Sequence, residues 1–203
     1  AMELIQPGAE ADSDFRGGYD IIGRLVDALD GRLLVKECGC GLSPAVVQRL
    51  SSLGVRAVDV SGTGGTSWVK VEALRATDEM ALRGHRFADW GLPTAAATGL
   101  AAQSDGVQVV SSGGIDDGLK AAKALSLGAT LAGAARPVLQ AFLADGEEGV
   151  ARTLQGFEDD LRMVMALTGC KRPSALRRVP RILGPRIRSW LSLETVEARI
   201  EDR

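Results

Sequence analysis

Hydrophobic and polar positions along the chain follow two alternating patterns. Short apolar segments are typical of strands, and they occur at residues 33–35, 55–60, 107–110 and 129–132. The first of them is a continuous run, as in a buried strand. Between these segments, apolar residues recur three or four positions apart, which indicates helices. We expect the helices at residues 19–29, 44–54, 68–74, 93–102, 116–128 and 147–167, with a shorter one starting at Pro137. Strands that alternate with helices predict a parallel sheet.

Polar residues mark the ends of several elements. Ser43 before Pro44 is a typical N-cap followed by a first-turn proline, and Asp116 is the expected cap of a later helix. The polar segment 77–89 holds the one histidine, His85, which we expect on a solvated loop. A zinc site or a Ser-His-Asp triad built on that histidine is therefore poorly supported.

The number of strands limits the fold. Four strands, each followed by a helix, make half of an eight-stranded barrel, which typically needs about 250 residues. We therefore predict an α/β fold of the (β/α)8-barrel family with about four βα units and additional C-terminal helices. The expected single domain spans 1–203, with a loop over 1–18, βα units over 19–145 and C-terminal helices over 146–203. An open, doubly wound four-stranded sheet is the alternative.

Half a barrel has two sheet edges with unpaired backbone groups, and exposed edges invite pairing. The chain begins in a loop with no preceding strand, so either it is a fragment or two halves associate. Leu34, Val58, Val60 and Val109 are the residues that we expect to face inward, without an opposite wall. We therefore predict a homo-oligomer, for which a two-fold dimer is the commonest symmetric form.

Composition and charge argue against several classes of function, among them nucleic-acid binding and membrane association. Of 203 residues, 45% are hydrophobic, and 24 basic against 26 acidic side chains give a net charge of -2. That balance favours neither nucleic acid nor an anionic membrane as a partner. Apolar runs fall short of the ~18 residues of a membrane span, and we recognise no secretory signal, so we expect a cytoplasmic protein. A basic run at 171–188 is interpreted as a solvated face or a subunit contact.

Two glycine-containing loops are candidates for an anion site. Each follows an expected strand and opens a helix, where unpaired backbone N–H groups point at a ligand. In α/β barrels, the loops after the last two strands bind phosphate. The candidate residues are Gly113 and Gly114 in the first loop, and Ala134 and Ala135 in the second. Ordinary βα turns that require glycine are the alternative interpretation.

Lys36 and the loop 61–67 are further candidates. A lysine at the carboxyl end of a barrel strand points into the site, where a cation would stabilise negative charge on a flavin ring. A structural ion pair with Glu37 is the alternative. The sequence Ser-Gly-Thr-Gly-Gly-Thr-Ser at 61–67 is typical of an anion-binding nest or of a flexible surface loop. Trp68 and Trp90 fit core anchors better than ligand walls.

Several motifs carry a resemblance to a known family. They are Val-Lys-Glu-Cys-Gly-Cys-Gly-Leu-Ser at 35–43, Asp-Val-Ser-Gly-Thr-Gly-Gly-Thr-Ser-Trp at 59–68, Trp-Gly-Leu-Pro-Thr at 90–94, Ser-Gly-Gly-Ile at 112–115 and Lys-Ala-Leu-Ser-Leu-Gly at 123–128. With them, nearly the whole chain resembles type 2 isopentenyl-diphosphate isomerase. The last two motifs are shared with other FMN or phosphate barrels, such as IMP dehydrogenase and 2-hydroxyacid oxidases, whereas the Val-Lys-Glu and Gly-Gly-Thr-Ser-Trp elements are more specific.

The resemblance implies an (α/β)8-barrel enzyme that binds FMN and Mg²⁺, with NADPH as the reductant of the flavin. Such enzymes interconvert isopentenyl and dimethylallyl diphosphate, so the implied substrate is a small-molecule diphosphate. Glu3 would match the Mg²⁺-binding glutamate of the family. The residues that the resemblance assigns to FMN are Lys36, Ser61, Thr66, Gly113, Gly114, Ala134 and Ala135.

The chain departs from the family at its start. The family has about four more strands before the point where this chain begins, and they carry substrate contacts and part of the FMN site. The family's glutamine, a proposed proton donor, falls at Met2, so we assign no catalytic residue. Two alternatives stay open, namely another FMN-dependent oxidoreductase barrel and a non-catalytic half-barrel that self-associates. A 2-hydroxyacid oxidase would want a catalytic histidine and an arginine near the flavin, and the only histidine available is His85, in a poor place for that role.

Overall fold

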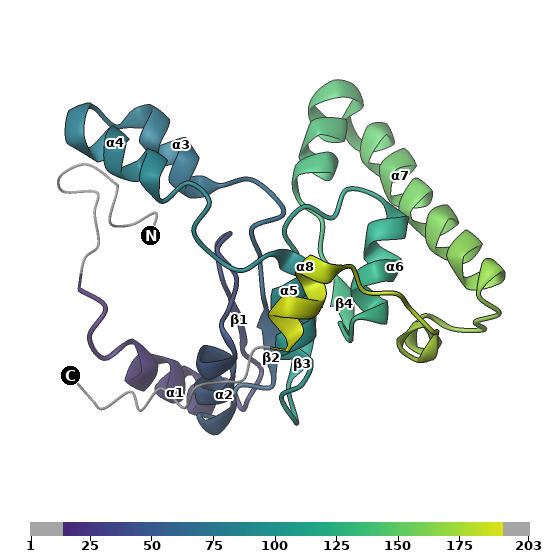
Figure 1. Ribbon diagram of the computed structural model, residues 1–203, viewed down its shortest axis with the longest axis horizontal. Coiled ribbons are helices and arrows are strands. Elements are labelled where there is room, and N and C mark those ends of the chain that lie inside the picture. The colour runs from purple at the N-terminus through teal and green to yellow at the C-terminus, as the bar shows by residue number, and fades with distance from the viewer. Residues whose placement is uncertain (1–13, 193–203) are drawn as a thin grey trace.

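A sheet of four parallel strands lies at the centre of the computed structural model, which describes residues 14–192 (Figure 1). The strands follow one another across the sheet in chain order, without a reversal. A doubly wound sheet reverses its order at a switch point, so this topology is that of a partial barrel. The strands are β1 (Leu34–Lys36), β2 (Ala57–Asp59), β3 (Gln108–Ser111) and β4 (Leu131–Ala132).

Helices follow each strand, as the apolar spacing predicted. Ser43 accepts a hydrogen bond from the backbone N–H of Val46 and so caps the second helix, while the cap before Gly118 is Asp117, one residue later than the expected Asp116. The helices are α1 (Gly18–Ala28), α2 (Pro44–Ser52), α3 (Trp68–Arg75), α4 (Asp78–Arg86), α5 (Thr94–Ala101), α6 (Gly118–Ser126), α7 (Arg136–Leu167), the 3-10 helix η2 (Pro173–Arg178) and α8 (Pro185–Leu191).

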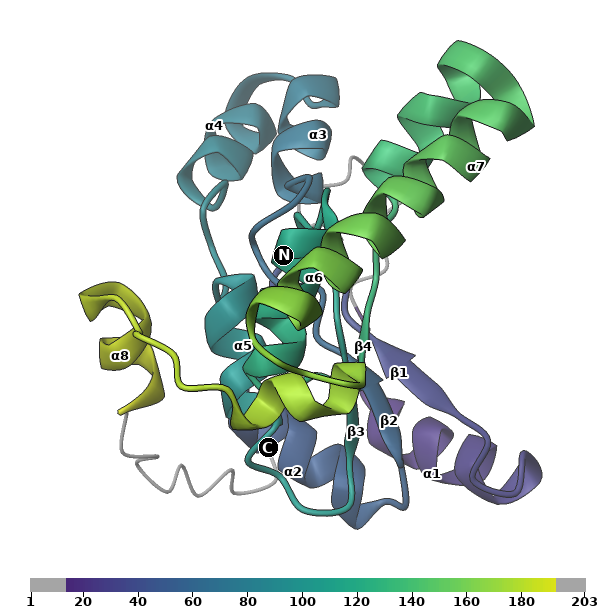
Figure 2. The same ribbon diagram turned by 90° about the vertical axis from the view of Figure 1, so that its right-hand side faces the viewer.

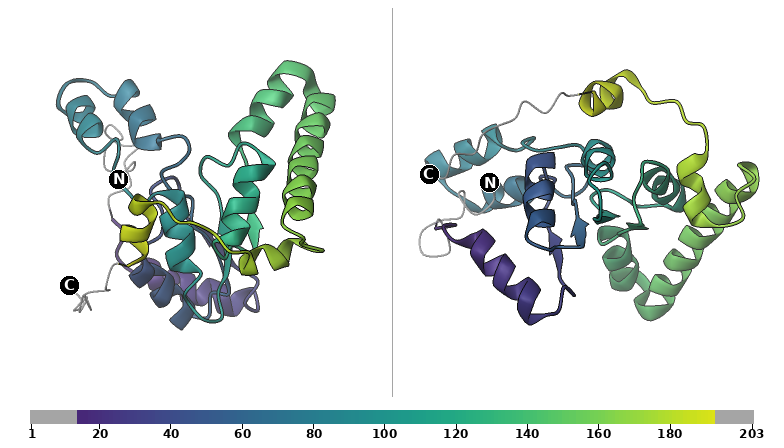
Figure 3. Two further views of the ribbon diagram at one scale, coloured as in Figure 1. Left: turned by 45° about the vertical axis from the view of Figure 1, so that its right-hand side comes forward. Right: turned by 90° about the horizontal axis from the view of Figure 1, so that it is seen from below.

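One face of the sheet is covered by helices and forms the main core. Helices α1, α2 and α5 lie on this side of the sheet (Figure 3, right). Val58, Val60 and Val109 are fully buried in a cluster with residues of these helices. On the opposite face, Leu34 remains 47% exposed and Leu131 remains 61% exposed. Of the four residues expected to face inward, Leu34 does lie on the open face, whereas the expectation is wrong for Val58, Val60 and Val109. These valines point to the helix-covered face, because alternate residues along a strand point to opposite faces. The expected buried strand at 33–35 is an edge strand with one open face.

A second core joins α6 to the long helix α7 and to η2 (Figure 2). Gly118, at the start of α6, permits this contact, since a Cβ there would overlap the carbonyl oxygen of Phe157. Its backbone N–H also donates to the Asp160 carboxylate at 3.1 Å. Helix α7 breaks at Asp145 and Gly146, where the backbone leaves helical geometry. The two expected helices, one from Pro137 and one over 147–167, are thus confirmed as the arms of α7.

The segment 77–89 forms helix α4 rather than an irregular loop. It pairs with α3 in a hairpin that stands away from the sheet (Figure 1). The hairpin is closed by an ion pair between Lys70 and Asp89 at 3.2 Å and by a hydrogen bond from Ser67 Oγ to the Ala88 carbonyl at 2.9 Å. His85 is exposed, as expected, but it lies on this helix and not on a loop.

Met2 and Glu3 lie outside the described residues, as does most of the expected loop over 1–18. The boundaries at 18 and 145 stay predictions. Within residues 14–192, no helix is both long and apolar enough to cross a membrane.

We expect the 203-residue chain to self-associate through the open face of the sheet, because apolar side chains and two strand edges are uncovered there. Leu131→Asp should shift the sedimentation coefficient toward that of a monomer. The matched control is Leu74→Asp, at an exposed leucine on α3, which should leave the association unchanged. A wild-type chain that stays monomeric at micromolar concentration and unfolds cooperatively would contradict this expectation.

Candidate functional site

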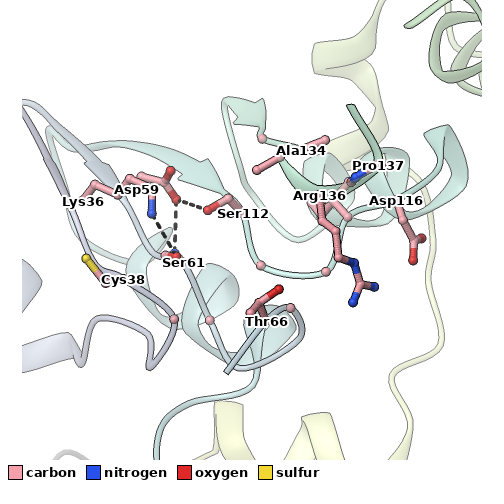
Figure 4. A pocket seen from close by; sticks show the side chains of 18 of the residues that line it. Lys36, Cys38, Asp59, Ser61, Thr66, Ser112, Asp116, Ala134, Arg136 and Pro137 are labelled. Atoms are coloured by element: carbon pink, nitrogen blue, oxygen red, sulfur yellow. Dashed lines mark hydrogen bonds between the residues drawn. The ribbon is translucent and has the colours of Figure 1, made fainter. Parts of the chain in front are cut away.

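The carboxyl ends of the four strands open onto one pocket (Figure 4). Its volume of about 420 Å³ falls in the range of ligand sites, roughly 300–1,000 Å³. The loop after each strand contributes to its lining, which is the position of the active site in α/β barrels. Every described residue that the sequence pointed to for FMN lines this pocket, namely Lys36, Ser61, Thr66, Gly113, Gly114, Ala134 and Ala135.

Lys36 ends β1 with its ammonium group held at the pocket. Its Nζ donates to the Glu37 carbonyl oxygen at 2.6 Å and to Ser61 Oγ at 3.1 Å. The Glu37 carboxylate serves another purpose, since it accepts backbone N–H bonds from the loop 39–41 at 2.5, 2.5 and 3.1 Å. The alternative of a structural ion pair between Lys36 and Glu37 is therefore wrong. The lysine is oriented by neutral oxygen atoms.

Asp59, at the end of β2, is a pocket residue that the sequence analysis did not single out. The residue as a whole is only 7% exposed. Asp59 Oδ1 accepts the backbone N–H of Ser61 at 3.1 Å and the hydroxyl of Ser112 at 2.6 Å. Ser61 has a φ of 39°, in the left-handed region that residues with a side chain rarely adopt. One carboxylate thus joins the loops that follow β2 and β3 (Figure 4).

The loop 61–67 lies directly against the loop after β3. A Cβ added at Gly113 would overlap the carbonyl oxygen of Gly62, and one at Gly114 would overlap that of Gly64. Gly62 N–H also donates to the Ser112 carbonyl oxygen at 3.1 Å. Packing this close does not fit the alternative of a flexible surface loop. Glycine is needed on both sides because the two backbones touch.

The segment 90–94 ties three of the pocket loops together. Thr94 Oγ1 donates to the Gly113 carbonyl oxygen at 2.7 Å and accepts the N–H of Gly64 at 3.1 Å. Leu92 N–H donates to the Cys40 carbonyl oxygen at 2.7 Å, and its own carbonyl accepts the N–H of Thr63 at 3.0 Å. The loops after β1, β2 and β3 therefore share this segment as a common support.

The two tryptophans differ from the expectation of core anchors. Trp68, at the start of α3, is half exposed and lines the pocket. Trp90 is more exposed and contacts Phe87, with 5.7 Å between the ring centroids. Neither ring is buried, because the α3–α4 hairpin stands away from the sheet.

The loops after β3 and β4 present backbone donors without acceptors. Within residues 14–192, the N–H groups of Gly113, Gly114, Ala134 and Ala135 have no hydrogen-bond partner. Arg136, the first residue of α7, also lines the pocket and adds a cation that the sequence analysis missed. Unpaired N–H groups beside a helix N-terminus and a guanidinium together favour an anion.

Asp116 is the acidic side chain nearest in sequence to this donor group. A hydrogen bond from Lys120 lowers the pKa of Asp116, and the charge of Arg136 lowers it slightly further. The Asp116 carboxylate is therefore ionised at neutral pH. Its charge is matched by the Lys120 ammonium at 2.5 Å, which limits its repulsion of an anion in the pocket.

No metal site is formed among residues 14–192, where no cluster of three or more His, Cys, Asp or Glu side chains could hold an ion. Because Glu3 is outside this range, its assignment to Mg²⁺ stays a prediction.

Comparison with known families identifies the barrel type. A family model described as FMN-dependent dehydrogenase matches residues 9–180. The chain belongs to this family. The match includes all four strands and every loop of the pocket, so the geometry above is that of a flavin-dependent family.

Curated relatives are similar over nearly the whole chain. The isopentenyl-diphosphate delta-isomerase of Methanothermobacter thermautotrophicus is 41% identical over 198 residues, which cover 98% of this chain and 55% of the relative. The protein of the same name from Synechococcus is 48% identical over 187 residues, which cover 91% of this chain and 52% of the relative. The chain therefore spans about half the length of the curated relatives it matches.

Solved structures confirm the fold. A mutant of an active chimera of (S)-mandelate dehydrogenase aligns with a TM-score of 0.62 at 22% identity, covering 83% of this chain and 41% of that chain. A mandelate oxidase mutant with the monooxide FMN adduct aligns with a TM-score of 0.60 at 21% identity, covering 88% of this chain and 50% of that chain. The predicted partial α/β barrel is thus confirmed.

We expect Gly114→Ala to lower the free energy of unfolding by at least about 2 kcal/mol. Left-handed backbone costs a residue with a Cβ roughly 1–2 kcal/mol, and overpacking adds roughly 1–3 kcal/mol. The control Gly156→Ala, at an exposed position of α7 with open space around it, should be neutral or stabilising by up to about 1 kcal/mol. Urea unfolding of both variants measures the difference, and equal effects would show that the glycine loops are not in contact.

Proposed function

We propose that the chain forms the FMN-binding half of an isomerase that interconverts isopentenyl diphosphate and dimethylallyl diphosphate in isoprenoid biosynthesis. One observation carries the proposal. The residues that the resemblance assigns to FMN come from the loops of all four strands and meet in one pocket, in a chain 48% identical to a protein named isopentenyl-diphosphate delta-isomerase.

The pocket fits the phosphate of FMN at one end. The unpaired N–H groups of Gly113, Gly114, Ala134 and Ala135 are donors of the kind that hold a phosphate at a helix N-terminus. The Arg136 guanidinium adds bidentate donors and a permanent positive charge. This end of the pocket therefore has both the donors and the charge that a phosphomonoester needs.

The other end fits a flat ring that gains negative charge. Lys36 presents its ammonium group beside Ser61, and Trp68 provides an exposed aromatic wall. When bound, FMN supplies a ring whose electron density a fixed cation tunes, with NADPH proposed as its reductant. The role of Lys36 is to hold its ammonium group at one position, which its two oxygen acceptors secure.

The remaining parts of the proposal lie on residues outside the described range or outside this chain. Glu3 would hold Mg²⁺, a hard cation that prefers carboxylate oxygen and commonly bridges to substrate phosphates. The substrate would be a small-molecule diphosphate, and the protein would work as a cytoplasmic homo-oligomer.

A 2-hydroxyacid oxidase is less well supported, because the single histidine of the chain, His85, lies on α4 and does not line the pocket.

Comparing FMN with riboflavin separates the two ends of the pocket. Arg136→Ala should weaken FMN binding about tenfold and leave riboflavin binding unchanged, because only FMN carries a phosphate. Lys36→Ala should weaken both ligands by a similar factor, because it acts on the ring. Quenching of flavin fluorescence measures each Kd, with Arg24→Ala on the exposed side of α1 as the charge-matched control. A wild-type chain that binds neither flavin would contradict the proposed function.

A chimera tests the isomerase reaction itself. In the chimera, this chain replaces the matching part of the Methanothermobacter relative. We expect the chimeric protein to be active when it is supplied with FMN, Mg²⁺ and NADPH. Conversion of isopentenyl diphosphate is followed by NMR, and the same chimera with Lys36→Ala serves as the low-activity control. If the chimera retains flavin but forms no dimethylallyl diphosphate, flavin binding stands and the isomerase assignment is wrong.

A further inference from the structure

We propose that Asp59 is a positioning residue of the flavin pocket. Its buried carboxylate holds Ser61 in the conformation that orients Lys36, and it fixes the spacing between the loops after β2 and β3. This inference rests on the proposed FMN site for its functional meaning, although the contacts that carry it are within the chain.

The burial of Asp59 requires an explanation. The carboxylate of a residue that is only 7% exposed loses most of its hydration, which is unfavourable unless hydrogen bonds replace it. The replacement is specific, since Oδ1 accepts the Ser61 backbone N–H and the Ser112 hydroxyl. An apolar residue at this position would avoid the desolvation but could hold neither loop. The carboxylate is therefore placed to organise its neighbours.

The contact with Ser61 determines where a hydroxyl group lies. The N–H of Ser61 bonds to a side chain two residues earlier, which is the arrangement by which aspartate stabilises a tight turn. In this turn Ser61 takes its φ of 39°, and its Oγ accepts a hydrogen bond from Lys36 Nζ at 3.1 Å. Without the carboxylate, the left-handed conformation of Ser61 loses one of its supports.

The position of the Lys36 ammonium depends on that hydroxyl. A lysine stem has rotatable bonds along its whole length, so its charge is fixed only where acceptors hold it. The acceptors here are the Glu37 carbonyl and Ser61 Oγ. The first lies on the neighbouring residue of the same strand end, whereas the second is placed by Asp59. The chain of contacts thus runs from the carboxylate of β2 to the ammonium of β1 (Figure 4).

The test compares Asp59→Ala with Asp59→Asn in the full 203-residue chain. Asp59→Ala should weaken FMN and riboflavin binding by a similar factor, about tenfold, because the group displaced is the ring cation. Asp59→Asn keeps an acceptor oxygen and should restore binding to within about threefold of wild type. Equal losses in both variants would assign the effect to charge and overturn positioning by hydrogen bonds.

Glu72→Gln is the matched control. Glu72 is also a buried carboxylate, but it lies on α3, outside the pocket lining, and pairs with Arg75. The control variant should lower the thermal midpoint without changing the Kd for either flavin. If Asp59→Ala behaves in the same way, with reduced stability but unchanged affinity and an unchanged spectrum of the bound flavin, Asp59 is a structural residue only and the proposal is wrong.

A measurement without flavin separates this inference from the proposed function. In the ¹³C NMR spectrum of the free chain, the Lys36 Cε signal should shift in Asp59→Ala and return in Asp59→Asn. Ser61→Gly removes the hydroxyl and relieves the left-handed backbone, so it should fold and should reproduce the shift seen in Asp59→Ala. A Lys36 signal that is unmoved in these variants would overturn the link, whether or not the wild-type chain binds FMN.

Discussion

The pocket depends on the direct contact between the glycine loops after β2 and β3. Because no side chain fits between Gly62, Gly64, Gly113 and Gly114, the two backbones approach closely enough to share one support, Thr94. In this arrangement the N–H groups of Gly113 and Gly114 have no hydrogen-bond acceptor among residues 14–192, and both residues line the cavity. A hydrogen bond from the Ser112 hydroxyl to the Asp59 carboxylate links the same two loops a second time. An anion site made of backbone atoms is only as well defined as the distance between the loops that carry it.

Helices cover only one face of the sheet, and this follows from the order of its strands. Four βα units wound in one direction place the connecting helices on one face, so Val58 and Val109 are buried and Leu34 and Leu131 are not. In a closed barrel the uncovered face is the interior, filled by layers of side chains from the other strands. The exposed leucines thus mark the side on which the rest of a barrel, or a second copy, would pack.

Much of this arrangement could be predicted from local patterns. The strands and most helices follow from apolar spacing, and Lys36, Gly113 and Ala134 could be placed because the carboxyl ends of parallel strands meet at one edge. The orientation of Val58, Val60 and Val109 toward the helices could not be predicted, because the strands of a parallel sheet are apolar on both faces and their pattern does not tell the faces apart. Asp59 was missed because its partner Ser112 is 53 positions away. Helix α4 was missed because it is largely polar and leans on α3 rather than on the sheet.

The described pocket lies on one half of a barrel, and this affects which residues would contact the cofactor and which would contact the substrate. In the proposed site, the loops after β3 and β4 would supply the phosphate donors, and the ends of β1 and β2 would supply Lys36 and its support, so neighbouring strands would hold both ends of the cofactor. A ring held this way would have one face toward the uncovered side of the sheet, where the opposite wall of a barrel would stand. A diphosphate placed on that face would draw its own contacts from the opposite wall. In the proposed enzyme, this half would carry the flavin contacts described above, and the opposite wall would carry the substrate contacts together with the remaining part of the FMN site, so flavin binding and turnover would be separable.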